Sequence, residues 1–442
     1  MKVKLKWRLS SFQIILLGFA AVILFGALVL MLPISSSSGK WTPFADALFT
    51  STSAVCVTGL VVYDTATHWS IFGQIILLLF IQIGGMGVVT VATSFWILSG
   101  KKIGLFSRGT LQEAISAPNV GGIVRLNKFI LKGVFLIEMI GALAMLPFFC
   151  SNFGARGIWM SVFHSVSAFC NAGFDVMGRS SGEFSSFTGY SAVPLVNIVL
   201  ILLIVVGGIG FLVWEDICSH RLQIHKYRMQ TKVVLAVTGL LILFPALYFF
   251  FAFRDLPPGE RVLASLFQSV TLRTAGFNTV NLADAGKAGV ALMMVLMLIG
   301  GSPGSTAGGM KTTTVAVLFA SMISVFRKKE HAELMKRRID PDVVKNASAI
   351  FLMYLTLFFT GGVLISTIEH LPLTDCLFEA ASAIGTVGLT LGITPQLGIA
   401  SKLILILFMF FGRVGGLTLI YAAFGNNRKQ ISRLPLEKIT VG

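Results

Sequence analysis

The sequence predicts an all-α integral membrane protein in which four tandem repeats surround a central pore. Each repeat consists of a helix, a short pore helix with a filter loop, and a second helix. The 442 residues are 55% hydrophobic and only 12% charged. Apolar runs such as 12–32 and 191–214 reach the roughly 20 residues needed to cross a bilayer. A short glycine-centred segment also recurs four times between long apolar runs, and this recurrence indicates the repeats.

The four segments are 56–60 (CVTGL), 170–174 (CNAGF), 273–277 (RTAGF) and 385–389 (GTVGL). Their central glycines are separated by 114, 103 and 112 residues. A glycine has no Cβ, so the backbone there adopts torsions that other residues resist. Rings of backbone carbonyls replace the hydration shell of a cation in channel filters. One such triplet is uninformative, but four in the same position of four repeats predict the wall of an ion pore.

The elements follow in the same order in each repeat. We expect outer helices over 12–33, 127–149, 231–253 and 345–368. Pore helices are expected over 43–55, 157–169, 260–272 and 373–384, followed by filter segments over 56–61, 170–175, 273–278 and 385–390. Inner helices are expected over 70–98, 191–213, 287–325 and 399–423. The repeats then cover 1–98, 99–213, 214–325 and 326–442, the last with a C-terminal tail.

Eight helices span the membrane in this scheme, and both termini lie on the same side. The pore helices, at about 12 residues, are too short to cross and are predicted to be re-entrant. The first apolar run resembles a signal peptide, but it is longer than the usual apolar region, so we interpret it as a retained helix.

The basic residues predict the orientation. The net charge is +16, and 25 of the 35 Lys and Arg residues lie in five stretches. These stretches are 1–10, 99–132, 214–232, 326–345 and 425–442. Such asymmetry places them in the cytoplasm, with both termini, and predicts a multi-pass protein of the plasma membrane. The charge sets topology and attracts anionic membrane lipid, whereas nucleic-acid binding is disfavoured.

The pore helices share small hydroxyl residues near their C-terminal ends, at Ser51, Ser53, Ser165, Ser167, Ser269, Thr271 and Ser382. Each helix C-terminus carries a partial negative charge that favours a cation. The predicted cation filter consists of Val57, Thr58, Gly59, Asn171, Ala172, Gly173, Thr274, Ala275, Gly276, Thr386, Val387 and Gly388. For the side chain of Asn171, bracing of the loop is favoured over contact with an ion.

A family resemblance rests on these stretches. Residues 386–388 (TVG) copy the core of the potassium-channel filter, and 267–271 (FQSVT) and 274–279 (TAGFNT) are the most diagnostic. Over nearly its full length the chain resembles the Trk/Ktr/HKT superfamily of potassium transporters, and it is most similar to KtrB-type membrane subunits. The resemblance implies K⁺ transport, a homodimer with one pore per subunit, and a cytoplasmic ring of KtrA-type nucleotide-binding subunits. It also implies Na⁺ dependence, for which no residue stands out.

The inner helix of repeat three is interrupted by residues rich in glycine. Six glycines or prolines within ten residues cannot hold a continuous helix. Non-helical backbone at membrane depth must line a cavity or lie within protein. In the resembled family this loop is the gate, here Gly300, Gly301, Ser302, Pro303, Gly304, Ser305, Thr306, Ala307, Gly308, Gly309, Met310 and Lys311. A phosphate-binding loop is disfavoured because Met310 intrudes and no strand precedes it, so no nucleotide is expected on this chain.

Arg413 is the second member of the gate region. Glycine pairs recur in the inner helices at 84–85, 207–208 and 300–301, but the fourth repeat has Gly412 followed by Arg413. A charge within an apolar helix normally faces a cavity or a partner. We expect Arg413 to face the pore below the filter, as the resemblance also implies. Pairing with Glu138 is the alternative.

Two other functions are weighed against a K⁺-selective pore. A poorly selective Na⁺/K⁺ pore is the alternative within transport, since one glycine per segment supplies few carbonyl layers. A membrane scaffold would dock cytoplasmic partners but has no need of four pore segments. No nucleophile with acid–base partners stands out, so an enzyme is not expected.

Overall fold

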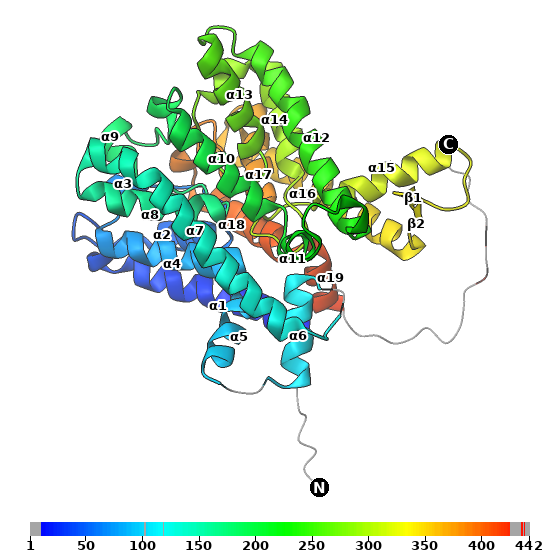
Figure 1. Cartoon of the computed structure of the whole chain (residues 1–442). Coiled ribbons are helices and arrows are strands. Elements are labelled where there is room, and N and C mark those ends of the chain that lie inside the picture. Colours follow the sequence, from blue (N-terminus) through cyan, green and yellow to red (C-terminus); the bar gives the residue numbers. More distant parts are fainter. Residues whose placement is uncertain (1–9, 101–102, 118, 425–434, 436, 438–442) are drawn as a thin grey trace.

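The computed structural model describes residues 10–100, 103–117, 119–424, 435 and 437. It is a bundle of helices with one small β-hairpin (Figure 1). The basic stretches at the two ends of the chain lie largely outside the described residues, so the predicted side of the termini stays a prediction.

The four outer helices are α1 (Ser11–Met31), α7 (Ile123–Phe153), α12 (Met229–Ala252) and α16 (Pro341–Glu369). Within the described residues, these four are individually long and apolar enough to cross a bilayer. Their starts follow from local chemistry: Ser10 and Gln13 form a capping box before α1, and the Asp340 side chain caps α16. Each outer helix packs against the pore helix of its own repeat.

The pore helices lie close to their predicted bounds. They are α2 (Phe44–Val55), α8 (Arg156–Phe169), α13 (Pro258–Thr271) and α17 (Leu373–Gly385). Their C-terminal halves are buried, and the filter segments that follow are buried with them. The core of the protein therefore lies around the four filter segments.

The inner helices differ from the prediction because none is continuous. They begin as α4 (Ile71–Met86), α10 (Pro194–Gly208), α14 (Gly286–Leu298) and α18 (Ile399–Val414). They resume as α5 (Val88–Leu98), α11 (Phe211–His220), α15 (Thr312–Phe326) and α19 (Gly416–Phe424). The bend is 93° between α4 and α5, and 96° between α10 and α11. The break was predicted in repeat three alone.

The breaks in repeats one, two and four have a common cause. Gly87, Gly210 and Gly415 have φ angles of 87°, 99° and 88°. A helix cannot continue through such a left-handed residue, and glycine adopts it without steric cost. Each of these glycines comes three residues after the first glycine of the recurring inner-helix pair.

Shorter elements connect the repeats. The helical ones are η1 (Pro33–Ser35), α3 (Thr65–His68), α6 (Leu105–Ile115), α9 (Gly178–Ser181), η2 (Thr188–Tyr190), η3 (Ile224–Lys226), η4 (Leu282–Ala285) and η5 (Thr394–Gln396). Strands β1 (Glu333–Leu334) and β2 (Arg337–Arg338) form an antiparallel hairpin between α15 and α16. Figure 1 shows α15 and this hairpin projecting from one side of the bundle.

Candidate ion pathway

The four filter glycines form a closed ring. Each lies against the backbone carbonyl of the residue that precedes the filter glycine of the next repeat. The pairs are Gly59 with Ala172, Gly173 with Ala275, Gly276 with Val387, and Gly388 with Thr58. A β-carbon built on Gly59 would lie 2.6 Å from the oxygen of Ala172, and on Gly173 it would lie 2.8 Å from Ala275. The structure thus brings the predicted filter residues of all four repeats together at one level.

The residue two positions before each filter glycine has a left-handed backbone. The φ angles are 57° at Val57, 58° at Asn171, 65° at Thr274 and 51° at Thr386. The filter glycines themselves have φ between 69° and 95°. Alternating handedness turns successive carbonyls toward the same side of the chain. Such torsions cost about 1–3 kcal/mol each in residues with a Cβ, and strain of this kind clusters at ligand-binding sites.

Hydroxyl groups of the pore helices hold this backbone in place. Ser53 accepts from the filter-glycine N–H of its own repeat at 3.0 Å, and Ser382 does so at 3.1 Å. Ser167 and Thr271 donate instead to the carbonyl just after the filter glycine, at 2.7 and 2.8 Å. A second set joins the pore helices of repeats one, two and three to their outer helices: Ser51 to Ile23, Ser165 to Glu138 and Ser269 to Ile242.

Two further anchors behind the filter were missed from the sequence. Glu379 is fully buried and accepts hydrogen bonds from Thr390 and Thr394, the latter at 3.0 Å. Nε2 of His164 accepts the backbone N–H of Val176 at 3.1 Å. Both anchors lie nine residues before a filter glycine and fix the outer end of a filter loop. Aligning the repeats on their glycines would have revealed the shared position.

In repeats one, two and four, the first glycine of the inner-helix pair packs against the C-terminal end of a pore helix. Gly84 contacts the carbonyl of Val55, Gly207 that of Phe169, and Gly412 that of Ile384. These three carbonyls all lie four residues before a filter glycine. A side chain at any of the three glycines would separate the inner helix from the pore helix.

The interrupted segment of repeat three, here called the gate loop (residues 299–311), is bound to the inner helices of repeats two and four. Ser302 and Thr306 donate their backbone N–H groups to Gly208 and Gly207, at 3.0 and 3.2 Å. Gly309 donates to Gly412 at 3.1 Å. Buried backbone groups need such partners, so the loop is fixed across the bundle without being helical.

Arg413 joins the gate loop to repeat one. Its guanidinium group donates to the carbonyls of Thr306, Gly84 and Gly85, the last at 3.0 Å. Arg413 also lines a cavity of about 130 Å³ together with Lys311 and Glu113. The charge therefore lies beside the gate loop, and its position facing the pore below the filter stays a prediction.

Glu138 does not pair with Arg413 in the part of the chain that the structure describes. Its carboxylate accepts from Nε2 of Gln82 at 3.2 Å and lies 3.9 Å from Sγ of Cys170. Asn171 makes contacts of the bracing kind: its side chain donates to the Arg273 carbonyl at 3.2 Å and accepts from Thr306 at 3.2 Å.

A buried ion pair joins repeats one and four. Nζ of Lys402 lies 2.7 Å from Oδ1 of Asp46, and the Tyr63 hydroxyl donates to Oδ2 at 2.7 Å. Burial, together with the hydrogen bond to Asp46 and its charge, raises the pKa of Tyr63 to about 12. The hydroxyl thus stays protonated, and remains a donor to Asp46, at ordinary pH.

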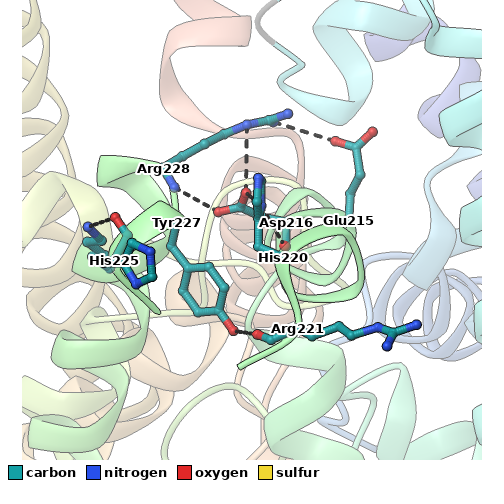
Figure 2. Close-up of polar contacts among 8 residues, drawn as sticks. Glu215, Asp216, His220, Arg221, His225, Tyr227 and Arg228 are labelled. Carbon is teal, nitrogen blue, oxygen red and sulfur yellow. Dashed lines mark hydrogen bonds and ion pairs between the residues drawn. The ribbon is translucent and has the colours of Figure 1, made fainter. Parts of the chain in front are cut away.

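The gate loop is also tied to the polar segment between α11 and α12. Phe211, the first residue of α11, donates its N–H to the Gly304 carbonyl at 2.7 Å. In the middle of α11, the buried Asp216 accepts from the Arg228 N–H at 2.9 Å and lies 3.1 Å from Nδ1 of His220 (Figure 2). One short helix thus connects this charged cluster to the gate loop.

Pore helices that converge on a carbonyl ring, within a bundle of membrane-spanning helices, define a pore-type cation transport protein. The sequence matches the model of the TrkH family, described as cation transport proteins, over residues 10–428. The chain belongs to this family, which confirms the predicted resemblance. Among the described residues, no group of three or more His, Cys, Asp or Glu side chains is arranged to hold a metal ion.

Relatives match along almost the whole chain. The potassium/sodium uptake protein NtpJ of Enterococcus hirae is 41% identical over 100% of this chain and 99% of its own length. The Ktr system potassium uptake protein B of Bacillus subtilis is 37% identical over 99% and 98%. The crystal structure of the potassium transporter TrkH from Vibrio parahaemolyticus shares the fold, with a TM-score of 0.72 and 19% identity over 95% of this chain and 86% of that one.

Proposed function

We propose that this chain is a potassium uptake protein and that the ring of carbonyls around its four filter glycines is the K⁺-selective filter. The observation that carries the proposal is the ring of contacts around the four filter glycines. Each filter glycine contacts the filter segment of the next repeat, and the fourth contacts the first. The names of the relatives, which are potassium or potassium/sodium uptake proteins, support K⁺ as the transported ion.

The proposed filter acts by electrostatics and positioning. Carbonyl oxygens of Thr58, Ala172, Ala275 and Val387 replace water around a dehydrating ion. The C-terminal ends of the four pore helices add partial negative charge around the same point. The serine, threonine, glutamate and histidine anchors hold the carbonyls, so the site needs no reorganisation when an ion enters. No covalent step is involved.

The gate loop and Arg413 form the proposed barrier below the filter. The loop is bound across the bundle by its backbone, and Arg413 places a fixed positive charge beside it. Deleting residues 304–310 should therefore raise Rb⁺ flux in folded protein, because it shortens the barrier. Unchanged low flux in folded, dimeric material would retire the gate assignment.

The remaining assembly is inferred from the family. We propose a homodimer in the plasma membrane with both termini in the cytoplasm and one pore per subunit. A cytoplasmic ring of KtrA-type subunits would bind the nucleotide and bias the gate loop, and uptake would depend on Na⁺. The Ktr-type relatives are named as parts of a system, which supports a partner.

Flux measurements on the purified chain in proteoliposomes test the proposal. Rb⁺ uptake should be inhibited by external K⁺ and little affected by equal Na⁺, with protein-free liposomes as the background control. Equal inhibition by K⁺ and Na⁺ would instead establish the poorly selective Na⁺/K⁺ pore. Absence of any cation flux, with and without the cytoplasmic partner, would contradict a transport function.

A further inference from the structure

Arg273 is a buried cation beside the filter of repeat three. It follows Leu272, which caps the C-terminal end of the pore helix α13, and it precedes Thr274 of the filter. Arg273 is only 4% exposed. In the part of the chain that the structure describes, it forms no ion pair. A charge without a counter-charge inside a membrane protein is costly, and it normally marks a functional position.

The contacts of Arg273 separate its backbone from its side chain. The backbone N–H donates to the carbonyl of Val270 at 3.0 Å, and the backbone carbonyl accepts from the Asn171 side chain of repeat two at 3.2 Å. In the side chain, Nη2 donates to Oγ1 of Thr238 on the outer helix α12 at 3.3 Å, whereas Nε is buried without a hydrogen-bond partner. The filter backbone is therefore held without the charge of the guanidinium group.

Repeat three differs from the other repeats at this position. The residue three positions before the filter glycine is Arg273 in repeat three, and it is Cys56, Cys170 and Gly385 in repeats one, two and four. The C-terminal end of a pore helix carries a partial negative charge, and a cation next to that end offsets it. The negative potential that the four pore helices direct at the filter is therefore reduced on one side of the ring.

A charge behind the filter acts on an ion through the valence of that ion. The α-carbon of Arg273 is three residues, or at most about 10 Å, from that of Gly276. A unit charge about 10 Å away weakens the binding of a monovalent cation roughly two- to fifteenfold at dielectric constants between 80 and 20. The energy is proportional to the charge of the ion, so the factor is squared for a divalent cation. It is the same for K⁺ and Na⁺, which differ in radius and not in charge.

We propose that Arg273 is a specificity-determining residue of the filter, whose uncompensated charge sets the affinity for monovalent cations and disfavours divalent ones. The inference rests on the proposed filter function and assigns one residue a part in it. Weaker binding also serves transport, because an ion must be able to leave the filter as well as enter it.

The competing role for Arg273 is structural. Its hydrogen bond to Thr238 joins the end of α13 to α12, and the loss of this bond would loosen the filter loop. A loosened filter would lose affinity and would change its preference between K⁺ and Na⁺. Loss of the charge alone raises the affinity and leaves that preference unchanged, so the two roles predict opposite results.

Rb⁺ uptake into proteoliposomes measures the effect of the charge. In Arg273→Gln, the apparent affinity for K⁺ should rise roughly two- to fifteenfold. Inhibition by Ba²⁺, which has nearly the radius of K⁺ and twice its charge, should tighten by the square of the factor found for K⁺. Arg273→Lys retains the charge and should shift both affinities much less. Arg254→Gln, which removes an exposed cation from the loop before α13, controls for the change in net charge.

Substitutions of Thr238 test the same charge from its other side and keep the test decisive if Arg273→Gln does not fold. Thr238→Asp places a carboxylate next to the guanidinium group, cancels its charge and should raise the affinities for K⁺ and Ba²⁺ as Arg273→Gln does. Thr238→Asn has nearly the same shape without the charge and should not. Equal effects of the two Thr238 variants, or equal factors for K⁺ and Ba²⁺, would overturn the proposal in favour of the structural role.

Thermal unfolding of the purified chain in Rb⁺ or Ba²⁺ measures binding separately from transport, because an ion that binds the folded protein raises its melting temperature. If the parent chain shows neither Rb⁺ flux nor stabilisation by these ions, the filter proposal fails and the role of Arg273 fails with it. If the parent shows both, and Arg273→Gln and Thr238→Asp change neither, the filter proposal stands and the role of Arg273 alone is wrong.

Discussion

Replacing Gly59 with alanine should lower the apparent affinity for K⁺ by displacing the carbonyl of Ala172. The φ angle of Gly59 is 95°, so an alanine there pays about 1–2 kcal/mol for the left-handed conformation. Its β-carbon would also lie 2.6 Å from the Ala172 oxygen, whereas ordinary contacts begin at 3.4 Å. The oxygen must therefore move by about 0.8 Å, the difference between these distances.

The magnitude follows from the weakened attraction. For an ion about 2.8 Å from an oxygen that carries about half a negative charge, a 0.8 Å retreat costs roughly 0.7 kcal/mol at an effective dielectric constant of about 20. Since 1.4 kcal/mol corresponds to a factor of ten, apparent affinity should fall about threefold for each ion position that this oxygen serves.

Gly392→Ala is the matched control. Gly392 has a φ of 98°, nearly that of Gly59, but a β-carbon there would meet nothing within 4 Å. The two variants share the backbone strain and differ in the contact with the filter. We would measure the K⁺ dependence of Rb⁺ uptake and the preference for K⁺ over Na⁺ in proteoliposomes. If Gly59→Ala matches Gly392→Ala in both, the filter assignment at this glycine is refuted.

Three further outcomes are expected. Arg413→Ala should raise cation flux per folded dimer, whereas Arg413→Lys should not, because lysine keeps the positive charge. A fixed charge about 4 Å from an ion repels it by roughly 1–4 kcal/mol at dielectric constants between 80 and 20. Lower flux in folded Arg413→Ala protein would contradict this prediction. Lys402→Met should destabilise the protein by about 3–5 kcal/mol, because it leaves the Asp46 carboxylate buried without its ion-pair partner, and adding Asp46→Asn should restore stability. Thermal unfolding of the parent, single and double variants measures this, and a Lys402→Met melting temperature equal to that of the parent would contradict it. Glu379→Leu should reduce the preference for Rb⁺ over Na⁺. Glu379→Gln should keep most of that preference, because it retains a hydrogen-bond acceptor for Thr394. The same loss of preference in both variants would show that the charge of Glu379 matters and the hydrogen bond does not.

The helices were predictable because their signals are local. Apolar runs and short amphipathic segments gave the pore helices within about two residues of their observed ends, since length and hydropathy decide whether a helix crosses or re-enters a membrane. The recurring glycines predicted that the four filter segments lie together, and they do so in the structure. The assignment of their residues to K⁺ binding stays a prediction, as do the boundaries of the repeats.

The misses have physical causes. Gly87, Gly210 and Gly415 end helices without a change in hydropathy, and a glycine in an apolar run is equally typical of close packing. The left-handed torsion of Val57 is invisible in the sequence, because β-branched residues normally avoid it and the surrounding fold imposes it here. The contact between Lys402 and Asp46 joins residues 356 positions apart, and no local pattern reports such a pair.

The last contact of the glycine ring joins Gly388 to Thr58, so the first and fourth repeats are neighbours in space. Helix α18 also packs on α2, and α19 packs on α1. A chain emerging from the ribosome therefore presents three quarters of a filter with one open side until the final repeat has been inserted. Premature termination anywhere before the fourth filter segment leaves a product that lacks both the closing carbonyls and Arg413, which makes completion of synthesis a condition for a sealed pore.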